Sequence, residues 1–550
     1  MERKNHIVAV DLGSSSVVVA VGETFDGGPV RIAAIVSKPV EGVNAGRIDN
    51  IELVSRAIRD AVSEVEARLG IRITEAYAGI SGDFVRCARH TDHVFVNDHQ
   101  TGVSQHDVES LFDRMRNVQA PDDEIIMERI PQNYVVDDNQ EVKNPVGSFG
   151  KKLSSTFNFI LCHKTPIQRL DMALKRLSIK MLGVFADLLA TPAALLQPEE
   201  KEEGVVVVDL GAGVTDVTVY YRNVVRYTVS IPMGASAINR DIRAMGVPEK
   251  HIENLKRKYG SAVADLAPED KLIRVNGRTS RDAKDILLKN LATVIEARAT
   301  DIAEFVMQEI KDSGYASKLS YGIVLTGGSA QLRDLDELFR RVTGMEVRVA
   351  VPDVEIDEES AELVADPAFA TVVGILIKGA EEGGCSIVEH ASVPTSSARP
   401  AAPAPAPAER PAPATSQQRF VPPQPQPPVQ PPRPRPAVQP QPAPGARPVP
   451  PRPAPVPRPQ PPQPPVQQPV ATPQPPHPQP PQPAPMPRPR PVHPLMQSEP
   501  DPWEGMVPPE PDEEPVVIEP RRKRDWGSIF KKVVGSMAGF DGEGADDEEI

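Results

Sequence analysis

The chain has 550 residues, of which 63 are proline, and a formal net charge of −14. This charge excludes a general nucleic-acid binder, which would need a basic face for phosphate contacts. The three cysteines, Cys87, Cys162 and Cys385, form no CxxC pair and no even disulfide framework, so they favour a reducing compartment over a disulfide-stabilised secreted fold.

The first 385 residues or so alternate strand-like and helix-like apolar runs, which is typical of an α/β protein. The N-terminus passes directly into a strand without the apolar run of a signal peptide, and no later run is long enough to span a bilayer. We therefore expect the protein to remain in the cytoplasm, unless its C-terminal end binds a membrane surface.

An internal repeat is the first organising feature along the chain. The run IVAVDLG begins at residue 7 and the run VVVVDLG begins at residue 205, so two near-identical strands end in Asp-Leu-Gly. After the first run, the pattern predicts a strand at 30–36, a helix at 50–69 and the strand ITEAYAGIS. The chain is therefore expected to build two related halves.

The segment 83–165 reads as a separate small α+β unit, with a helix near 105–117 between short strands. Thr165 and Pro166 then predict the N-cap and first turn of the next helix. The second half repeats the strand, strand and helix order and adds further helices near 248–259, 282–312 and 367–379 and a strand near 346–351.

The proline-rich text from 394 to 515 predicts a linker. It cannot bury enough apolar surface to offset chain entropy, and proline favours extended polyproline II. Its reach should lie between about 60 Å as a coil and about 360 Å when fully extended. A role as a ligand for SH3-like modules is the alternative that this composition leaves open.

A short amphipathic helix is predicted close to the C-terminus. A helical register places apolar residues in one stripe: Trp526, Ile529, Phe530, Val533, Val534 and Met537. The basic residues around it are Arg521, Arg522, Lys523, Arg524, Lys531 and Lys532. Such a helix is marginal in water, so it should fold on anionic lipid as a reversible anchor that does not cross the bilayer. The alternative is that the stripe packs back onto the folded part of the chain.

Three glycine-containing loops carry the predicted chemistry. Each follows a buried strand, and glycine lets the backbone N–H groups approach phosphate oxygens, to which serine and threonine hydroxyls add donors. Asp11 and Asp209, at the two strand ends, could hold Mg²⁺ directly or through water. Two such loops facing each other would bind one triphosphate between them. The candidate residues are Asp11, Gly13, Ser14, Ser15 and Ser16 in the first loop, Asp209, Gly211, Gly213 and Thr215 in the second, and Gly327, Gly328 and Ser329 in the third.

Glu253 and Lys256 stand three residues apart on one face of the helix predicted at 248–259. Alone they read as a surface ion pair, but beside the three loops they become candidate contacts for a ribose and base. VGSFGKKLS is not a P-loop, because only two residues separate Gly147 from Gly150.

These motifs resemble the actin, Hsp70 and sugar-kinase superfamily and, within it, the FtsA family of bacterial cell-division proteins. Residues 246–262 (GVPEKHIENLKRKYGSA) resemble the adenosine-side helix of that family, and IPMGASAINRDI, which contains Gly234, resembles the segment entering the nucleotide cleft. The run NYVVDDNQEVKNPVGSFGKKL resembles the FtsA-specific inserted subdomain. The resemblance covers residues 1 to about 380 and the extreme C-terminus.

The resemblance implies an α/β, actin-like (ribonuclease H-like) duplicated ATPase fold with an inserted small α+β subdomain, followed by a disordered proline-rich linker and an amphipathic helix. The implied division is subdomain 1A at 1–82 and 166–203, 1C at 83–165, 2A at 204–238 and 313–385, 2B at 239–312, the linker at 386–520, the membrane-binding helix at 521–540 and an acidic tail at 541–550.

The resemblance also implies ATP and Mg²⁺ as ligands, and a role as an adaptor that polymerises head to tail and attaches FtsZ to the cytoplasmic side of the membrane at the division site. The implied partners are the FtsZ C-terminal peptide, further copies of the chain, other division proteins and anionic lipid, with no nucleic acid. Arg298, in the family-like run VIEARATDIAEF, is the implied FtsZ contact.

Two departures from the family pattern stand out. Ser16 occupies a position where FtsA proteins often carry lysine, and Thr191 precedes Pro192 where related bacterial actins carry a water-orienting glutamate. We therefore expect ATP binding with slow or negligible turnover. A sugar kinase or an Hsp70-like chaperone remains an alternative, although no sugar pocket or β-rich peptide-binding domain is recognisable.

Overall fold

The computed structural model describes residues 4–25, 28–98, 100–138, 140–276, 283–385, 387–389 and 518. The proline-rich linker is therefore described only at residues 387–389 and at Ile518. The predicted membrane-binding helix at 521–540 and the acidic tail at 541–550 lie outside the described residues.

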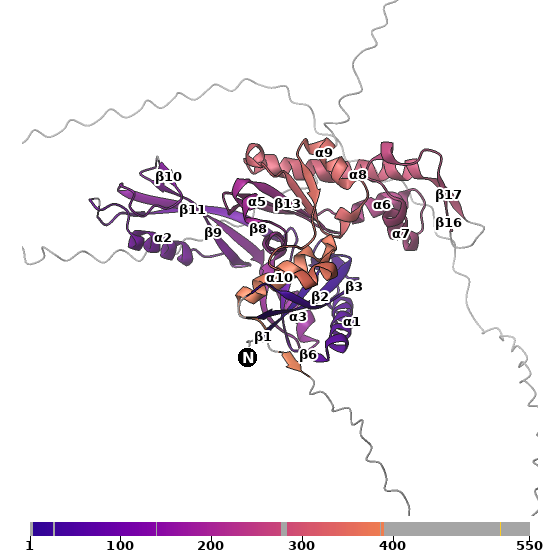
Figure 1. Ribbon diagram of the computed structural model, residues 1–550, viewed down its shortest axis with the longest axis horizontal. Helices are drawn as coiled ribbons and strands as arrows, with labels where there is room; N and C mark the ends of the chain where they lie inside the picture. The colour runs from indigo at the N-terminus through magenta and orange to yellow at the C-terminus, as the bar shows by residue number, and fades with distance from the viewer. Residues whose placement is uncertain are drawn as a thin grey trace, which may run out of the picture. The chain divides into compact units, whose positions relative to one another are not determined.

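The first half of the fold is built on a five-stranded sheet with the order β12-β7-β1-β2-β3. Figure 1 labels β1, β2 and β3 of this sheet. Strand β1 pairs antiparallel with β2 and parallel with β7, and β7 pairs parallel with β12. Ile7, Val8, Ala9 and Val10 of β1 are all fully buried, because helices cover both faces of the sheet. The strands are β1 (Lys4–Leu12), β2 (Ser16–Phe25), β3 (Arg31–Pro39), β7 (Glu75–Ile80) and β12 (Lys180–Ala186).

The second half repeats this sheet with the order β15-β14-β13-β18-β19. Strand β13 is antiparallel to β14 and parallel to β18, as β1 is to β2 and β7. The expected duplication is thereby confirmed at the level of strand order and direction. The strands are β13 (Val205–Leu210), β14 (Thr215–Tyr221), β15 (Val224–Ile231), β18 (Ile323–Thr326) and β19 (Val347–Val349).

Helix boundaries follow local capping signals where these exist. Helix α1 (Ile51–Leu69) begins after Asn50, whose side chain accepts from two backbone N–H groups, and ends at Gly70 in the left-handed conformation. Helix α3 (Lys164–Lys175) begins one residue before the predicted N-cap Thr165, and its N-cap His163 makes no side-chain capping bond. The predicted helix at 282–312 is wrong at its start, because Lys284–Leu287 forms strand β17 before α8 (Leu288–Asp312).

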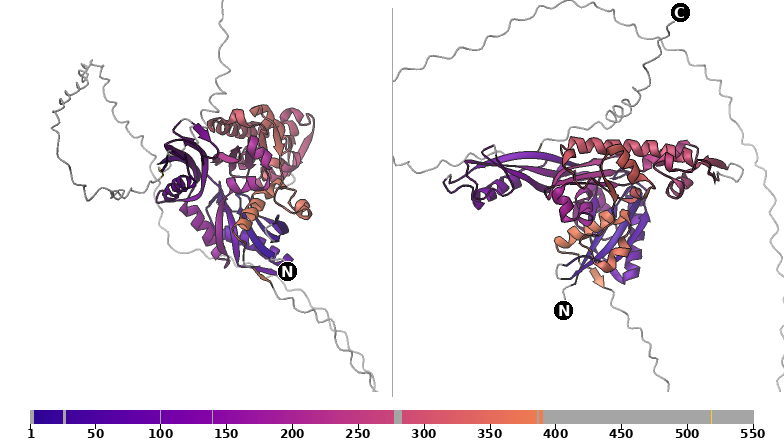
Figure 2. Two further views of the ribbon diagram at one scale, coloured as in Figure 1. Left: turned by 60° about the vertical axis from the view of Figure 1, so that its left-hand side comes forward. Right: turned by 45° about the horizontal axis from the view of Figure 1, so that its top comes forward.

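The inserted unit lies between β7 and α3 and consists of a sheet with the order β10-β9-β11-β8 covered by α2. In the second half a helix and a hairpin, α7 and β16–β17, lie between α6 and α8. The inserted sheet and this hairpin extend in opposite directions from the β13 sheet (Figures 1 and 2). The elements are β8 (Val85–Phe95), α2 (Gln105–Asn117), β9 (Glu124–Val136), β10 (Gln140–Val142), β11 (Lys152–His163), α6 (Ser236–Ala244), α7 (Glu249–Tyr259), β16 (Leu272–Val275) and β17 (Lys284–Leu287).

Helix α10 (Ala370–Glu381) packs against the β1 sheet, where Val373 and Leu376 are fully buried. Among the described residues no single helix is long and apolar enough to cross a membrane, and one pair meets that test only jointly, Glu358–Val364 with Pro367–Glu381, bent by 107°. The remaining elements are β4 (Val43–Asn44), β5 (Arg47–Ile48), β6 (Ile71–Ile73), α4 (Asp187–Ala190), η1 (Thr191–Ala194), α5 (Pro198–Glu203), η2 (Ala264–Leu266), η4 (Ala316–Lys318), η5 (Gly328–Gln331), α9 (Leu335–Thr343), η6 (Glu358–Val364), η7 (Pro367–Phe369) and β20 (Ile387–Glu389).

Candidate functional site

The first two glycine loops have the same backbone design. In the first, the Gly13 N–H donates to the Ser16 carbonyl at 2.9 Å, and in the second the Gly211 N–H donates to the Val214 carbonyl at 2.9 Å. Each loop closes the hairpin that follows the central strand of its sheet. The duplication therefore extends from the sheets into the loops.

The two loops approach each other closely. A Cβ atom on Gly213 would lie 2.5 Å from the Ser14 hydroxyl oxygen and 3.0 Å from the Ala45 nitrogen. The Ser14 hydroxyl oxygen also accepts a hydrogen bond from the Gly46 N–H at 3.2 Å. Glycine at 213 is thus required by this contact, and Ser14 is the first-loop residue that faces the second loop. Ser15 is exposed beside them.

The third loop packs on the second. Gly327 has φ of +86°, and a Cβ there would lie 2.2 Å from the Asp209 Oδ1, so a side chain is excluded both by conformation and by space. The Ser329 hydroxyl donates to the Gly211 carbonyl at 3.0 Å. Gly328, in contrast, has only Ala368 near its Cβ position, at 3.7 Å.

The segment around Gly234 lies over the second loop. The Ala235 N–H donates to the Gly211 carbonyl at 3.1 Å and the Ser236 N–H donates to the Ala212 carbonyl at 2.8 Å. The Thr215 hydroxyl donates to the Met233 carbonyl at 2.8 Å, which directs this hydroxyl toward the protein. These contacts place five predicted residues close together, through backbone approach and the Ser329 hydroxyl: Gly211, Gly213, Gly234, Gly327 and Ser329.

Four carboxylates gather where the loops meet: Asp11, Asp187, Asp209 and Asp216. Asp187 and Asp216 are each 7% exposed, whereas Asp11 and Asp209 retain partial exposure. Burial raises the pKa of Asp11 to about 7, with repulsion from Asp209 and Asp216 adding to the shift. Burial likewise raises the pKa of Asp216 to about 7. The pKa of Asp187 lies well above its ordinary range because of burial and the negative charge of the other three.

Hydroxyl groups hold two of these carboxylates in place. The Ser81 and Ser230 hydroxyls each donate to Asp216 at 2.5 Å, and Ser81 belongs to the first half whereas Asp216 belongs to the second. The Thr191 and Thr371 hydroxyls donate to Asp209 Oδ2 at 3.2 Å and 2.8 Å. These bonds offset part of the cost of burying ionised groups, although burial still raises the pKa of Asp209.

One oxygen of the cluster has no partner. Asp187 Oδ1 is buried and accepts no hydrogen bond from the residues that the structure describes. A divalent cation, which prefers oxygen ligands, would relieve both this unpaired oxygen and the repulsion among the carboxylates. Within the described ranges no three Asp, Glu, His or Cys side chains enclose a metal position by themselves. A cation here would therefore also need oxygens from water or from a ligand.

The predicted pair on α7 is formed. Lys256 Nζ lies 2.8 Å from Glu253 Oε2, and Lys256 is 7% exposed. The Asn239 side-chain amide donates to the same Glu253 oxygen at 2.9 Å, which ties α7 to α6 and thus to the segment that follows Gly234. A lysine this buried is unusual for a surface ion pair.

Arg298 lies apart from the loops and is held by two carboxylates. Its guanidinium donates to Asp241 at 2.6 Å and to Asp301 at 2.9 Å, and the hydrogen bond that Asp241 accepts raises the pKa of Arg298. Its side chain is 22% exposed. Any partner that binds this guanidinium would therefore share it with these two side chains.

Sequence reasoning did not select Asp187, Asp216 or Ser81 as site residues. Asp216 could have been found, because it stands opposite Asp209 in the β13–β14 hairpin. Asp187 begins α4, far from any glycine loop in sequence, and reaches the site because β12 runs parallel to β7. Nothing local in the sequence marks it.

Two sheets of one strand order, with their first hairpin loops facing each other beside a carboxylate cluster, define the class of actin-like ATPase folds. The chain belongs within that class to the FtsA family of cell division proteins. It is 30% identical over 377 residues to Cell division protein FtsA of Pseudomonas aeruginosa, covering 68% of this chain and 89% of the relative. It is also 30% identical over 383 residues to the Escherichia coli K12 protein, covering 68% and 90%.

Two family profiles match parts of the chain. "Cell division protein FtsA" matches residues 206–374, and "SHS2 domain inserted in FTSA" matches residues 82–161, which confirms the inserted α+β unit. Among solved structures, a PilM–PilN type IV pilus biogenesis complex has a TM-score of 0.47 at 14% identity, covering 68% of this chain and 98% of that one. ADP-bound MreB5 of Spiroplasma citri has a TM-score of 0.41 at 14% identity, covering 69% and 99%.

Proposed function

We propose that the chain binds ATP with Mg²⁺ between its two glycine loops. The observation that carries this proposal is the pairing of facing loops with a cluster of acidic groups in which Asp187 Oδ1 has no partner. Backbone N–H groups and the Ser14, Ser15 and Ser16 hydroxyls would face phosphate oxygens, while Asp11 and Asp209, the partly exposed carboxylates, would hold Mg²⁺ through water. Glu253 and Lys256 would contact the ribose and base.

Turnover in this site should be slow or negligible. Hydrolysis needs a group that orients the attacking water. The position before Pro192 holds Thr191, whose hydroxyl donates to Asp209 and which is only 1% exposed. Bound Mg²⁺ would neutralise phosphate charge, but Thr191 has no carboxylate with which to position water. The bound nucleotide would then serve mainly to set the geometry of the two halves.

We further propose that the chain acts as a division-site adaptor, consistent with its family. Head-to-tail assembly, binding of the FtsZ C-terminal peptide within 239–306 through Arg298, and reversible attachment to anionic lipid through 521–540 together make up this role. The amphipathic stripe and its basic residues support the lipid step, since burial of the apolar face and attraction to anionic headgroups add together.

Calorimetric titration of the full-length protein with ATP and Mg²⁺ tests the nucleotide site. Binding should be measurable for the native chain and should weaken by roughly tenfold or more in Asp209→Asn, where a cation-holding charge is removed. Asp60→Asn, at an exposed position of α1, is the matched control and should bind as the native chain does. Absence of binding to well-folded native protein would overturn the proposal.

Vesicle co-sedimentation tests the lipid step separately. The full-length chain should sediment with anionic vesicles, and Phe530→Asp should greatly reduce the bound fraction because it places a charge in the apolar stripe. Val466→Asp, in the proline-rich segment, introduces the same charge elsewhere and should leave sedimentation unchanged. Equal sedimentation of Phe530→Asp and the native chain would exclude the predicted helix as the anchor.

A further inference from the structure

Ile518, far beyond strand β20 in sequence, lies against the inserted subdomain. Its backbone N–H donates to the Gln119 carbonyl at 3.0 Å, and its residue is 7% exposed. Its side chain belongs to an apolar cluster with buried residues of α2, its C-cap and β11, namely Met115, Val118, Phe157, Phe159 and Leu161. Ile518 is thus held both by a backbone hydrogen bond and by burial of its side chain, which is the pattern of a bound peptide strand.

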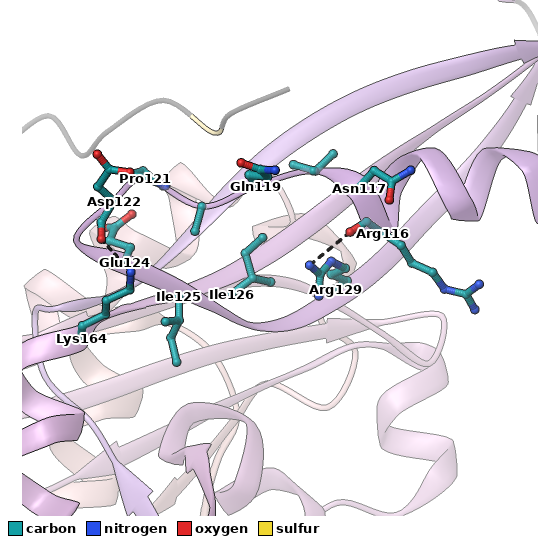
Figure 3. Close-up of a pocket in the computed structure, with 12 residues that line it drawn as sticks. Arg116, Asn117, Gln119, Pro121, Asp122, Glu124, Ile125, Ile126, Arg129 and Lys164 are labelled. Carbon is teal, nitrogen blue, oxygen red and sulfur yellow. Dashed lines mark hydrogen bonds between the residues drawn. The ribbon is translucent and has the colours of Figure 1, made fainter. Parts of the chain in front are cut away.

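The receiving surface lies beside the loop between α2 and β9. This loop follows Asn117 and contains Gln119 and Pro121, and it borders a cavity of about 520 Å³ (Figure 3). In the inserted sheet β9 pairs along its length with β11, whereas β10 covers only its end at Tyr134–Val136. The first part of β9 is therefore a sheet edge among the described strands, and the loop carbonyl of Gln119 accepts the N–H of Ile518.

Both signs of charge line this cavity: the carboxylates are Asp122 and Glu124, and Glu124 pairs with Arg86. The basic residues are Arg116, Arg129 and Lys164, and all three are exposed. Among them, Arg116 forms an ion pair with Asp113 at 2.7 Å. Arg129 donates to the Arg116 carbonyl at 3.5 Å and Lys164 donates to the Asp122 carbonyl at 2.7 Å, as Figure 3 shows. Among the described residues neither Arg129 nor Lys164 forms an ion pair with a carboxylate, so both cations are available to an acidic ligand.

The sequence around Ile518 has the matching charge. Residues 510–519 read EPDEEPVVIE, with five acidic residues around an apolar VVI. We propose that this segment is a docking peptide for the inserted subdomain of its own chain: Ile518 enters the apolar site beside Gln119, and the flanking carboxylates face Arg116, Arg129 and Lys164. Opposite charges on the two surfaces favour this encounter and fix its direction.

Docking would change the reach of the chain's end. Only Glu519 and Pro520 separate Ile518 from the basic run that begins at Arg521. A docked Ile518 would hold that run within about 10 Å of the inserted subdomain, whereas release would extend its range by the whole proline-rich linker. The consequence for membrane attachment rests on the proposed function: docking would restrict the lipid-binding helix to the vicinity of the inserted subdomain.

Hydrogen–deuterium exchange of the full-length protein, without lipid or nucleotide, tests the docking. The amide of Ile518 and the segment 116–126 should be protected, and Ile518→Asp should accelerate exchange of the Ile518-containing peptide by roughly tenfold or more because it places a charge in an apolar site. Val466→Asp adds the same charge within the linker and should not alter either segment. Equal exchange in Ile518→Asp and the native chain would overturn the proposal.

Two further measurements separate docking within one chain from other causes of protection. Protection should not depend on protein concentration over about a hundredfold range, because the two partners belong to one molecule; protection that increases with concentration would assign the peptide to a second copy and contradict the proposal. Arg129→Glu should reduce protection at Ile518 severalfold and raised salt should do the same, since the contact is partly electrostatic. If protection at Ile518 changed neither in Arg129→Glu nor at raised salt, the charge-based recognition proposed here would be wrong.

Discussion

The two halves of the core share a backbone but differ in the chemistry of their loops. Hairpin pairing aligns them residue by residue: Asp11 opposes Val18 in the first half, and Asp209 opposes Asp216 in the second. The loop between is Gly-Ser-Ser-Ser in the first half and Gly-Ala-Gly-Val in the second. The first loop thus offers hydroxyl donors, whereas the second offers close backbone approach and an additional buried carboxylate.

The two aspartates at the strand ends, Asp11 and Asp209, also differ in the hydrogen bonds that hold them. Asp209 accepts hydrogen bonds from Thr191 and Thr371, while the Asp11 carboxylate accepts none from the side chains that the structure describes. The two halves therefore share a backbone geometry, but their strand-end aspartates differ in how they are held. One aspartate is held rigidly, and the other is free to respond to a ligand or cation.

The largest expected effect concerns the pH dependence of stability and Asp216, the carboxylate that has no counterpart in the first half. In the folded state Asp11 and Asp216 have a pKa of about 7, so the fold binds their protons more tightly than the unfolded chain does. The contribution of these two groups to the free energy of unfolding should be greatest below about pH 4, near the pKa of an aspartate in the unfolded chain. It should fall as the pH rises to about 7, by on the order of 4 kcal/mol for each group. Asp216→Asn should remove a large part of this loss.

Urea unfolding of the nucleotide-free protein between pH 5 and pH 8 measures this difference. Asp216→Asn should have a shallower decline of unfolding free energy with pH than the native chain. Asp60→Asn is the control, since its carboxylate is exposed on α1 and should leave the slope unchanged. A native stability that rises across this interval would contradict the assigned sign.

An intermediate effect is expected when the second glycine loop is made more like the first, and the quantity affected is the affinity for ATP. Gly213 is the counterpart of Ser15, and a Cβ on Gly213 would lie 2.5 Å from the Ser14 hydroxyl oxygen. Gly213→Ser should separate the loops and weaken ATP binding by about 10- to 100-fold, the equivalent of roughly 1–3 kcal/mol of overpacking. Calorimetry measures the affinity. The reciprocal Ser15→Gly, at an exposed position, should change it much less, and similar losses in both variants would mean that the loops do not differ as described.

Much of the core could be predicted from the sequence because its signals are local. Apolar strands ending in Asp-Leu-Gly specify both central hairpins, and Asn50 and Gly70 mark the ends of α1. The predicted start of α8 is wrong because the periodic pattern runs on through Lys284–Leu287, where pairing with β16 outweighs helix formation.

The same limit applies to the site. Asp11, Asp209 and the glycines lie in or beside loops that can be recognised from their amino-acid composition. Asp187 reaches them only through the register of parallel strands. Likewise Thr371 comes from α10, 162 residues beyond Asp209 in sequence. Ile518 is more extreme, since nothing in a proline-rich segment predicts a contact with Gln119.

The smallest effect should come from the two threonines that hold Asp209. Thr371→Val should destabilise the fold by about 1 kcal/mol or slightly more and Thr191→Val by less, because their hydroxyls lie 2.8 Å and 3.2 Å from Asp209 Oδ2. The two hydroxyls also lie 2.9 Å from each other, so their effects should couple. Losing both leaves Asp209 as poorly held as Asp11, so the double variant should lose more than the sum. A double-mutant cycle in urea measures the coupling, and strict additivity would show that the threonines act on Asp209 independently.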